Sequence, residues 1–191
     1  MGKGLTNDMV LKELHELHVK RCMLLGIDLT HPENTQTPLR CARADMEHFH
    51  SKDSLNFTVF KNQGYDQMIV KPSIPFSSLC QHHLYPYFGV CHIGYVPKSK
   101  ICGLSKLARL VAYKAKGASS QEWLNQQVAD YLEKELRPKG VIVVMKAKHT
   151  CEMCRGVRND SMDSYFITSV MKGVFHKPQD QSRMEFFQLI K

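Results

Sequence analysis

The sequence predicts an α+β protein in which two helices cover one face of an antiparallel four-stranded sheet and further helices precede it. Three observations support this: apolar residues at helical spacing near the N-terminus, extended runs rich in β-branched and aromatic residues, and two helical stretches in mid-chain. With 191 residues, 43 % of them hydrophobic, the chain suits one core with a small extension. We expect a helical extension at residues 1–50 and the main domain at 51–191.

The first two helices are marked by periodicity and by a proline. Residues 7–25 carry apolar side chains at helical spacing, which predicts a helix. Pro38 suits the first turn of a second helix, because the N–H that proline lacks would be unpaired there anyway. This helix is expected to be capped by Thr37 and to run to about His48.

The main domain is expected to begin with a hairpin. Residues 65–80 and 84–97 predict two antiparallel strands with the segment 80–83 at their bend. Gly117 ends the first central helix, and Pro138 and Gly140 end the second. The remaining predicted elements are two central helices, two strands and a terminal helix, at 105–116, 119–136, 141–149, 165–175 and 179–190.

Positive charge is in excess but dispersed. Lys and Arg number 26 against 18 Asp and Glu, a net charge of +8, so we expect an anionic partner such as a phosphorylated small molecule. The absence of a basic run or a basic helix with interleaved aromatics argues against nucleic acid. No apolar run approaches the roughly 20 residues of a membrane helix, and the N-terminus does not resemble a signal peptide. We expect a soluble, cytoplasmic protein that binds neither nucleic acid nor membrane.

Two short clusters combine thiols with imidazoles. They are Cys80-Gln81-His82-His83 and His149-Thr150-Cys151, and each lies at the end of a predicted strand. Thiolates and imidazoles are the usual ligands of zinc, and a short turn can deliver two of them at once. Because strand ends of one sheet can converge, the two clusters predict a metal site.

A second arrangement of the metal site is also compatible with the residues. Cys151 and Cys154 form a Cys-x-x-Cys pair, and with Cys80 and His83 they would complete a Cys3His set. A closed four-ligand set is typical of structural zinc, whereas a catalytic site keeps one position open for water. The residues alone leave both arrangements open.

Other segments could bind an anion or a base. Ser105, Lys106 and Arg109 fall at a helix start, where N–H groups and the helix dipole favour an anion, although a Ser cap with a solvated basic face is the alternative. Glu122 and Gln121 could hydrogen-bond a base edge. The plainer alternative for Glu122 is a capping box with Ser119. Further anion-binding candidates, for which a solvated surface charge is the plainer alternative, are Arg155, Arg40 and Arg43.

Taken in chain order, these segments resemble GTP cyclohydrolase I, over roughly residues 37–191. The resemblance implies the tunnelling fold (T-fold) as the catalytic domain, zinc as the cofactor and GTP as the substrate. It also implies a homodecamer of two stacked pentameric rings, with active sites between subunits. The motifs that carry it are Cys80 to Leu84, His92 to Tyr95, Gly103 to Arg109, Gln121-Glu122, His149 to Cys151, Arg155-Gly156 and Gly173 to Phe175.

The resemblance also implies the chemistry. Cys80, His83 and Cys151 would hold zinc, and a water in the open position would attack C8 of guanine. His82 and His149 would transfer protons, His149 to the imidazole ring nitrogen of the base. Loss of C8 as formate, an Amadori rearrangement and ring closure would give 7,8-dihydroneopterin triphosphate.

The same resemblance implies how the substrate is held. Ser105 would assist at the ribose, and Gln121 and Glu122 would hold the guanine edge. Triphosphate binding would fall to five cationic residues, some from a neighbouring subunit: Lys106, Arg109, Arg155, Arg40 and Arg43.

Three departures leave room for an altered nucleotide preference, such as dGTP. The family usually has Glu at the position of Gln81 and a basic pair at the position of Lys116-Gly117, and Cys154 is an extra thiol near the metal site. Two other functions are weighed against the cyclohydrolase. One is a related nitrile reductase, which would not need the set of Cys80, His83 and Cys151. The other is a binding module stabilised by structural zinc.

Overall fold

The computed structural model describes residues 6–50, 54–161, 163–177 and 181–191. It divides into two compact units, Met1–Asp53 and Ser54–Lys191. None of the helices in these described ranges is both long and apolar enough to cross a membrane.

The first unit is a pair of helices. Helix α1 (Asn7–Leu24) begins at Thr6, whose hydroxyl accepts the backbone N–H of Met9, and α2 (Thr37–His50) packs against it. His18 and Asp45 join the two helices, with Nε2 and Oδ2 2.7 Å apart. Both helices match their predicted bounds closely, but Thr37 is the first residue of α2 and not its cap.

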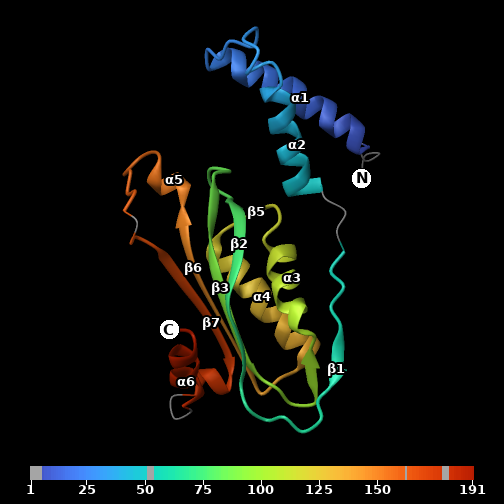
Figure 1. The fold of residues 1–191 in the computed structure, drawn as a ribbon, viewed down its shortest axis with the longest axis vertical. Helices are drawn as coiled ribbons and strands as arrows, with labels where there is room; N and C mark the ends of the chain where they lie inside the picture. The colour runs from blue at the N-terminus through green and yellow to red at the C-terminus, as the bar shows by residue number, and fades with distance from the viewer. Residues whose placement is uncertain (1–5, 51–53, 162, 178–180) are drawn as a thin grey trace. The chain divides into compact units, whose positions relative to one another are not determined.

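The second unit is built on a five-stranded sheet with the order β5-β2-β3-β6-β7 (Figure 1). The four long strands are antiparallel neighbours, as predicted, and β2 and β3 form the expected hairpin. The fifth strand, β5, is a two-residue strand parallel to the end of β2. The bounds are β2 (Ile69–Cys80), β3 (Pro86–Val96), β5 (Ala118–Ser119), β6 (Gly140–His149) and β7 (Phe166–Gly173).

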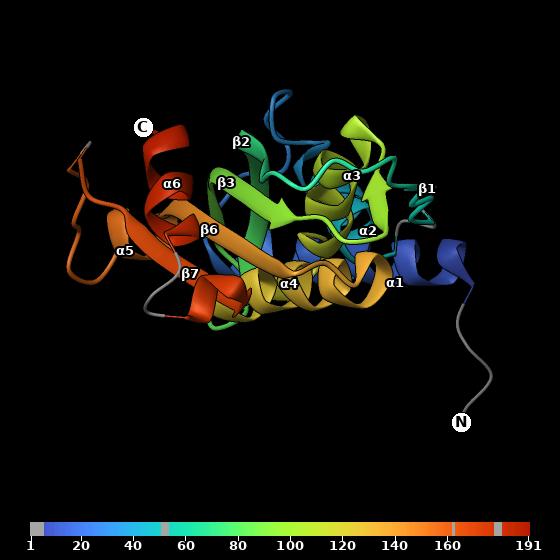
Figure 2. The ribbon, with the colours of Figure 1, turned by 90° about the horizontal axis from the view of Figure 1, so that it is seen from below.

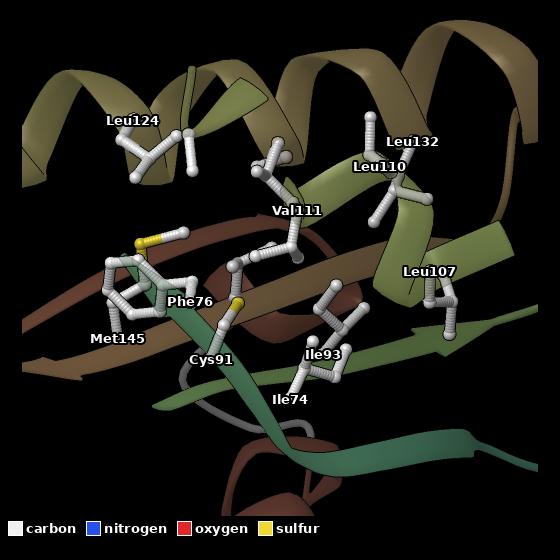
Figure 3. Close-up of a cluster of buried hydrophobic side chains, with 14 of the residues drawn as sticks. Ile74, Phe76, Cys91, Ile93, Leu107, Leu110, Val111, Leu124, Leu132 and Met145 are labelled. Carbon is white, nitrogen blue, oxygen red and sulfur yellow. The ribbon is translucent and has the colours of Figure 1, made fainter. Parts of the chain in front are cut away.

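Two helices, α3 (Leu104–Lys114) and α4 (Gln121–Leu136), cover one face of this sheet. On α4 the apolar residues recur every four positions and are fully buried, which explains why this helix forms and which side it packs. Burying each such leucine contributes roughly 1.5–3 kcal/mol. Figure 3 shows this core, which includes Ile74, Phe76, Cys91, Ile93, Leu107, Leu110, Val111, Leu124, Leu132 and Met145.

The opposite face carries the C-terminal helix α6 (Ser182–Leu189), as Figure 2 shows. Its Phe186 packs on Gly94, where a Cβ would lie 2.6 Å from the ring, so this strand position must lack a side chain. A 3₁₀ turn (Val174–His176) leads into this region. The sequence predicted the terminal helix but not that it covers the second face; residues 179–180, the start of the predicted helix, lie outside the described residues.

Besides β5 and the 3₁₀ turn, three small elements of the described chain were not predicted. Strands β1 (Val59–Lys61) and β4 (Lys100–Cys102) pair as a separate two-stranded sheet, and α5 (Thr150–Met153) follows β6 directly. Elements this short carry too few residues to show a period.

The length of the sheet separates its two ends. Strand β3 runs from Tyr87, opposite His149, to Tyr95, opposite Val141. These eight steps correspond to about 26 Å at roughly 3.3 Å per residue. Whatever lies at one end of the sheet is therefore remote from the other within this chain.

The two ends differ in their chemistry. The cysteine end is the end at which β2 stops at Cys80 and β6 stops at His149. At the opposite end of the sheet, the backbone N–H of Cys102 donates to Tyr95 Oη at 3.4 Å, so Cys102 lies beside the end of β3. The first two turns of α3, with Lys106 and Arg109, follow Cys102, and we call this the basic end. Figure 1 shows α3 rising from β4 toward β5.

Candidate metal centre and active site

The two thiol–imidazole clusters meet at the cysteine end. The β3–β6 register sets Tyr87 opposite His149, and β5 pairs Ser119 with Cys80. Helix α5 starts directly after β6, and the Thr150 hydroxyl donates to the Pro86 carbonyl at 2.6 Å, which ties α5 to the start of β3. Segments about seventy residues apart in sequence are thus brought to one place by strand pairing.

A thiol pair and an imidazole form the centre of the site. Ligand atoms of Cys80, His149 and Cys151 all lie within 4.8 Å of one another. Two further imidazoles approach the same sulfur, with His82 Nδ1 at 3.7 Å and His83 Nδ1 at 4.0 Å from Cys80 Sγ. Burial, and then the neighbouring Cys80 thiol, raise the pKa of Cys151.

This donor set fits zinc. Two sulfurs at about 2.3 Å from a tetrahedral ion lie roughly 3.8 Å apart, so ligand atoms within 4.8 Å of one another are compatible with a coordinated set. Thiolate and imidazole are borderline-soft donors, which suit zinc better than magnesium or calcium. Cys154 lies apart from this set, because its Sγ donates to the Thr150 carbonyl at 2.8 Å.

The predicted ligand His83 has a competing partner. Its Nε2 lies 2.8 Å from Arg155 Nη1, and since a guanidinium can only donate, Nε2 accepts this hydrogen bond. The imidazole whose nitrogen lies within 4.8 Å of both thiol sulfurs is that of His149, where the prediction had His83. Both imidazoles remain next to the thiol pair.

The His149 ring is held between aromatic side chains. It stacks on Tyr87 with centroids 4.5 Å apart and an interplanar angle of 3°, and it meets Phe166 edge-on at 5.2 Å. Burial lowers the pKa of His149, against an opposing effect of Glu122 and Glu152. The imidazole is therefore neutral near pH 7.

Gln121 and Glu122 begin α4 but face different surroundings. The Gln121 side chain is 2 % exposed, and its Oε1 lies 2.9 Å from His149 Nε2. Glu122 is exposed and lines the pocket. The predicted capping box is wrong: the cap is Ser120, whose hydroxyl accepts the N–H of Trp123, because Ser119 is paired in β5.

These side chains surround a cavity of about 220 Å³. Complete small-molecule sites usually enclose about 300–1,000 Å³, so this cavity suits a ring system better than a whole nucleotide. The cavity is lined by Cys80, His82, His83, Ser120, Gln121, Glu122, His149, Cys151, Glu152 and Phe166.

The remaining predicted residues belong to other helices. Ser105, Lys106 and Arg109 are on α3 at the basic end and do not line the cavity. Arg40 and Arg43 are exposed on α2 of the first unit.

Sequence reasoning missed the aromatic residues that hold His149. Tyr87 follows the Cys80 cluster by only a few residues, and the hairpin register places it opposite His149. A pairing scheme drawn from the predicted strands could have found it. Phe166 is brought to His149 by the β6–β7 pairing, which sets it opposite Ala147, two residues before His149.

Comparison with known proteins identifies the family. The family model for GTP cyclohydrolase I matches residues 15–191. GTP cyclohydrolase 1 of Sulfurihydrogenibium sp. (strain YO3AOP1) is 45 % identical over 167 residues, 87 % of each chain. The Aquifex aeolicus protein of the same name is 45 % identical over 157 residues, covering 82 % of this chain and 83 % of that one. The archaeosine synthase QueF-Like structure in the apo form is a remote likeness, 10 % identical with a TM-score of 0.43 over 59 % of this chain and 97 % of that one. The chain belongs to the GTP cyclohydrolase I family.

Proposed function

We propose that this chain is a cytoplasmic, zinc-dependent GTP cyclohydrolase I that converts GTP to 7,8-dihydroneopterin triphosphate and formate. The observation that carries the proposal is the thiol pair Cys80 and Cys151 with an imidazole inside a cavity sized for a ring system. Membership of the family supplies the reaction. All seven cysteines are free thiols, which fits the reducing cytoplasm.

Cys80 and Cys151 would hold the zinc, with His83 as the third ligand. When bound, zinc supplies Lewis-acid chemistry that makes a water usable as a nucleophile near neutral pH. His83 Nδ1 already lies 4.0 Å from Cys80 Sγ, but His149 is the imidazole grouped with the thiols. Zinc content of His83→Ala and His149→Ala decides between them: the true ligand variant loses zinc, and the other keeps about one ion per chain.

The remaining groups of the cavity suit proton transfer and base recognition. His149, neutral and half-buried, presents an imidazole that can take up and return a proton, and exposed His82 lies beside the same thiol. Glu122, with its carboxylate at the cavity, can accept two N–H bonds from the Watson–Crick edge of guanine.

The triphosphate site would be completed by a second copy of the chain. Lys106 and Arg109 lie in the first two turns of α3, which begins at the end of the sheet opposite Cys80, and neither residue lines the cavity. Arg155, which contacts His83, is the cation next to the cavity. We propose a decamer of two stacked rings in which Ser105, Lys106 and Arg109 face a neighbour's cavity, with Arg40 and Arg43 as further phosphate ligands.

The test is incubation of the zinc-loaded protein with GTP, followed by assays for formate and, after mild oxidation, for fluorescent neopterin. Both products are expected. Formate without the pterin would mean that ring opening occurs but rearrangement fails, and would limit the proposal to hydrolysis. Neither product, with zinc bound, would overturn the proposal. Running dGTP in parallel measures whether Gln81, in place of the usual Glu, alters nucleotide preference.

A further inference from the structure

The side-chain amide of Gln121 is engaged entirely inside the protein. Its Nε2 donates to the carbonyls of Met145 and Phe166, both at 3.1 Å, and lies 3.2 Å from Thr168 Oγ1. Its Oε1 faces His149 Nε2 at 2.9 Å. A side chain that is buried and has every polar atom paired has nothing left to offer a base.

These partners determine which way the amide points. Backbone carbonyls only accept, so the group facing Met145 and Phe166 must be the NH₂. Turning the amide over would set its oxygen against two carbonyl oxygens inside the core. The atom facing His149 is therefore the oxygen, which can only accept.

The orientation of the Gln121 amide in turn selects the tautomer of His149. A neutral imidazole carries one proton, and the hydrogen bond to Gln121 Oε1 requires that proton on Nε2. Nδ1 is then the nitrogen with a free lone pair, available for a proton or a metal ion. Stacking on Tyr87 and the edge contact with Phe166 keep the ring in this plane.

We propose that Gln121 is a positioning residue for His149 and not a reader of the guanine edge. The proposal deepens the cyclohydrolase function proposed above. It assigns base recognition to Glu122 and gives Gln121 the task of presenting His149 Nδ1 to the cavity. Gln121 directly precedes Glu122 on α4, so the two different roles fall on adjacent residues.

The form of His149 can be read directly. Solid-state ¹⁵N NMR of sedimented, zinc-loaded protein labelled at histidine distinguishes a protonated from an unprotonated ring nitrogen, and His149→Ala identifies the signal. We expect His149 to carry its proton on Nε2, and Gln121→Met to give a mixture of forms. A proton on Nδ1 in the unmutated protein would overturn the proposal.

Kinetics separate positioning from base reading. Gln121→Met should lower kcat about 10- to 100-fold while leaving both the KM for GTP and the preference for GTP over inosine triphosphate unchanged. Glu122→Gln is the matched control on the same helix turn, and should raise KM and reduce that preference. If Gln121→Met behaves as Glu122→Gln does, with kcat unchanged, Gln121 reads the base and the proposal is wrong.

A second variant protects the test against misfolding. Thr168→Val removes one hydrogen-bond partner of the Gln121 NH₂ without altering the cavity lining. We expect the same pattern at smaller size, about a threefold lower kcat at constant KM, corresponding to the loss of part of one hydrogen bond. A changed KM with unchanged kcat would contradict the proposal. Because the NMR measurement needs no turnover, it judges Gln121 even if the unmutated protein fails to release formate.

Discussion

The cysteine end and the basic end of the sheet differ in how far their polar side chains are buried and paired with neighbouring residues. At the cysteine end the key side chains are buried or half-buried and have named partners: His149 is stacked, and Gln121 is fully hydrogen-bonded. At the basic end Ser105 and Arg109 are exposed on the first two turns of α3. This difference supports our proposal that one chain builds the metal and base-binding part of the site and that a neighbouring copy supplies the phosphate-binding part.

The edge of the sheet gives the same indication. In β7, the edge strand, Phe166 and Ile167 are 51 % and 64 % exposed. Large apolar side chains on an open strand edge are a liability that proteins usually cover by pairing. A neighbouring copy on this edge would cover them.

The largest expected effect is at the cysteine end. Cys151→Ala should lose zinc and reduce formate production at least about a thousandfold, because a metal ion supplies several kcal/mol of stabilisation and each 1.4 kcal/mol is tenfold in rate. Cys154→Ala is the matched control and should keep both, because the hydrogen bond of its thiol goes to the Thr150 carbonyl and Cys154 is not in the group of potential metal ligands found among the described residues. Zinc content and initial rate are the measurements. If Cys154→Ala loses zinc instead, the site is the closed four-ligand kind.

A complementation experiment tests whether the two ends meet between subunits. Lys106→Ala should lower the rate about 10- to 100-fold through loss of a charge-assisted hydrogen bond, and Cys80→Ala should be inactive. Co-expression of the two variants should restore part of the activity, because a site can then take Cys80 from one chain and Lys106 from another. Mixed oligomers that stay inactive would show that both residues must come from the same chain.

Substituting one glycine at each end by alanine compares how tightly the two ends are packed. A Cβ at Gly89, opposite Ala147 near the cysteine end, would overlap the Lys146 carbonyl oxygen, so Gly89→Ala should cost about 3 kcal/mol or more. At Gly103, before α3, the nearest atom is Lys106 Cγ at 3.4 Å, and Gly103→Ala should change stability by less than about 1 kcal/mol. Thermal unfolding measures both. Equal losses would mean that the two ends are equally tightly packed.

The smallest effect is expected for an ion-pair group toward the basic end. Lys172 on β7 bonds Asp130 and Glu133 of α4, with Nζ 2.6 Å from Glu133 Oε2. Both carboxylates are about half exposed, so Lys172→Met should cost at most about 1 kcal/mol.

The pH dependence of this ion pair has a definite sign. Burial alone would raise the pKa of Asp130, but hydrogen bonds from Lys172 and Gln126 outweigh it and lower the pKa below 3.8. Its stabilisation is present above pH 3.8 and is lost as pH falls through the lower, folded value. The difference in unfolding temperature between Lys172→Met and the unmutated protein should therefore shrink in acid. A difference that grows in acid would contradict the assignment.

Features that depend on neighbouring residues were predictable. The hairpin with its bend at 80–83, helix α1 and the strand β6 follow from periodicity and turn residues within a few positions. The two thiol–imidazole clusters were also visible, since their spacing along the chain is local. The prediction that Ser119 caps α4 was wrong, because Ser119 pairs with Cys80 in the β2–β5 ladder and the helix begins after Ser120.

By itself, the sequence determined the α+β class, the family and the set of residues that can carry the chemistry. Only the tertiary structure showed that His149 lies within 4.8 Å of the thiol pair, that the Gln121 amide is hydrogen-bonded inside the protein and that Lys106 lies toward the other end of the sheet. The physical reason is that side-chain identity and local period are written along the chain. Burial and convergence, in contrast, depend on strand register and helix packing between segments tens of residues apart.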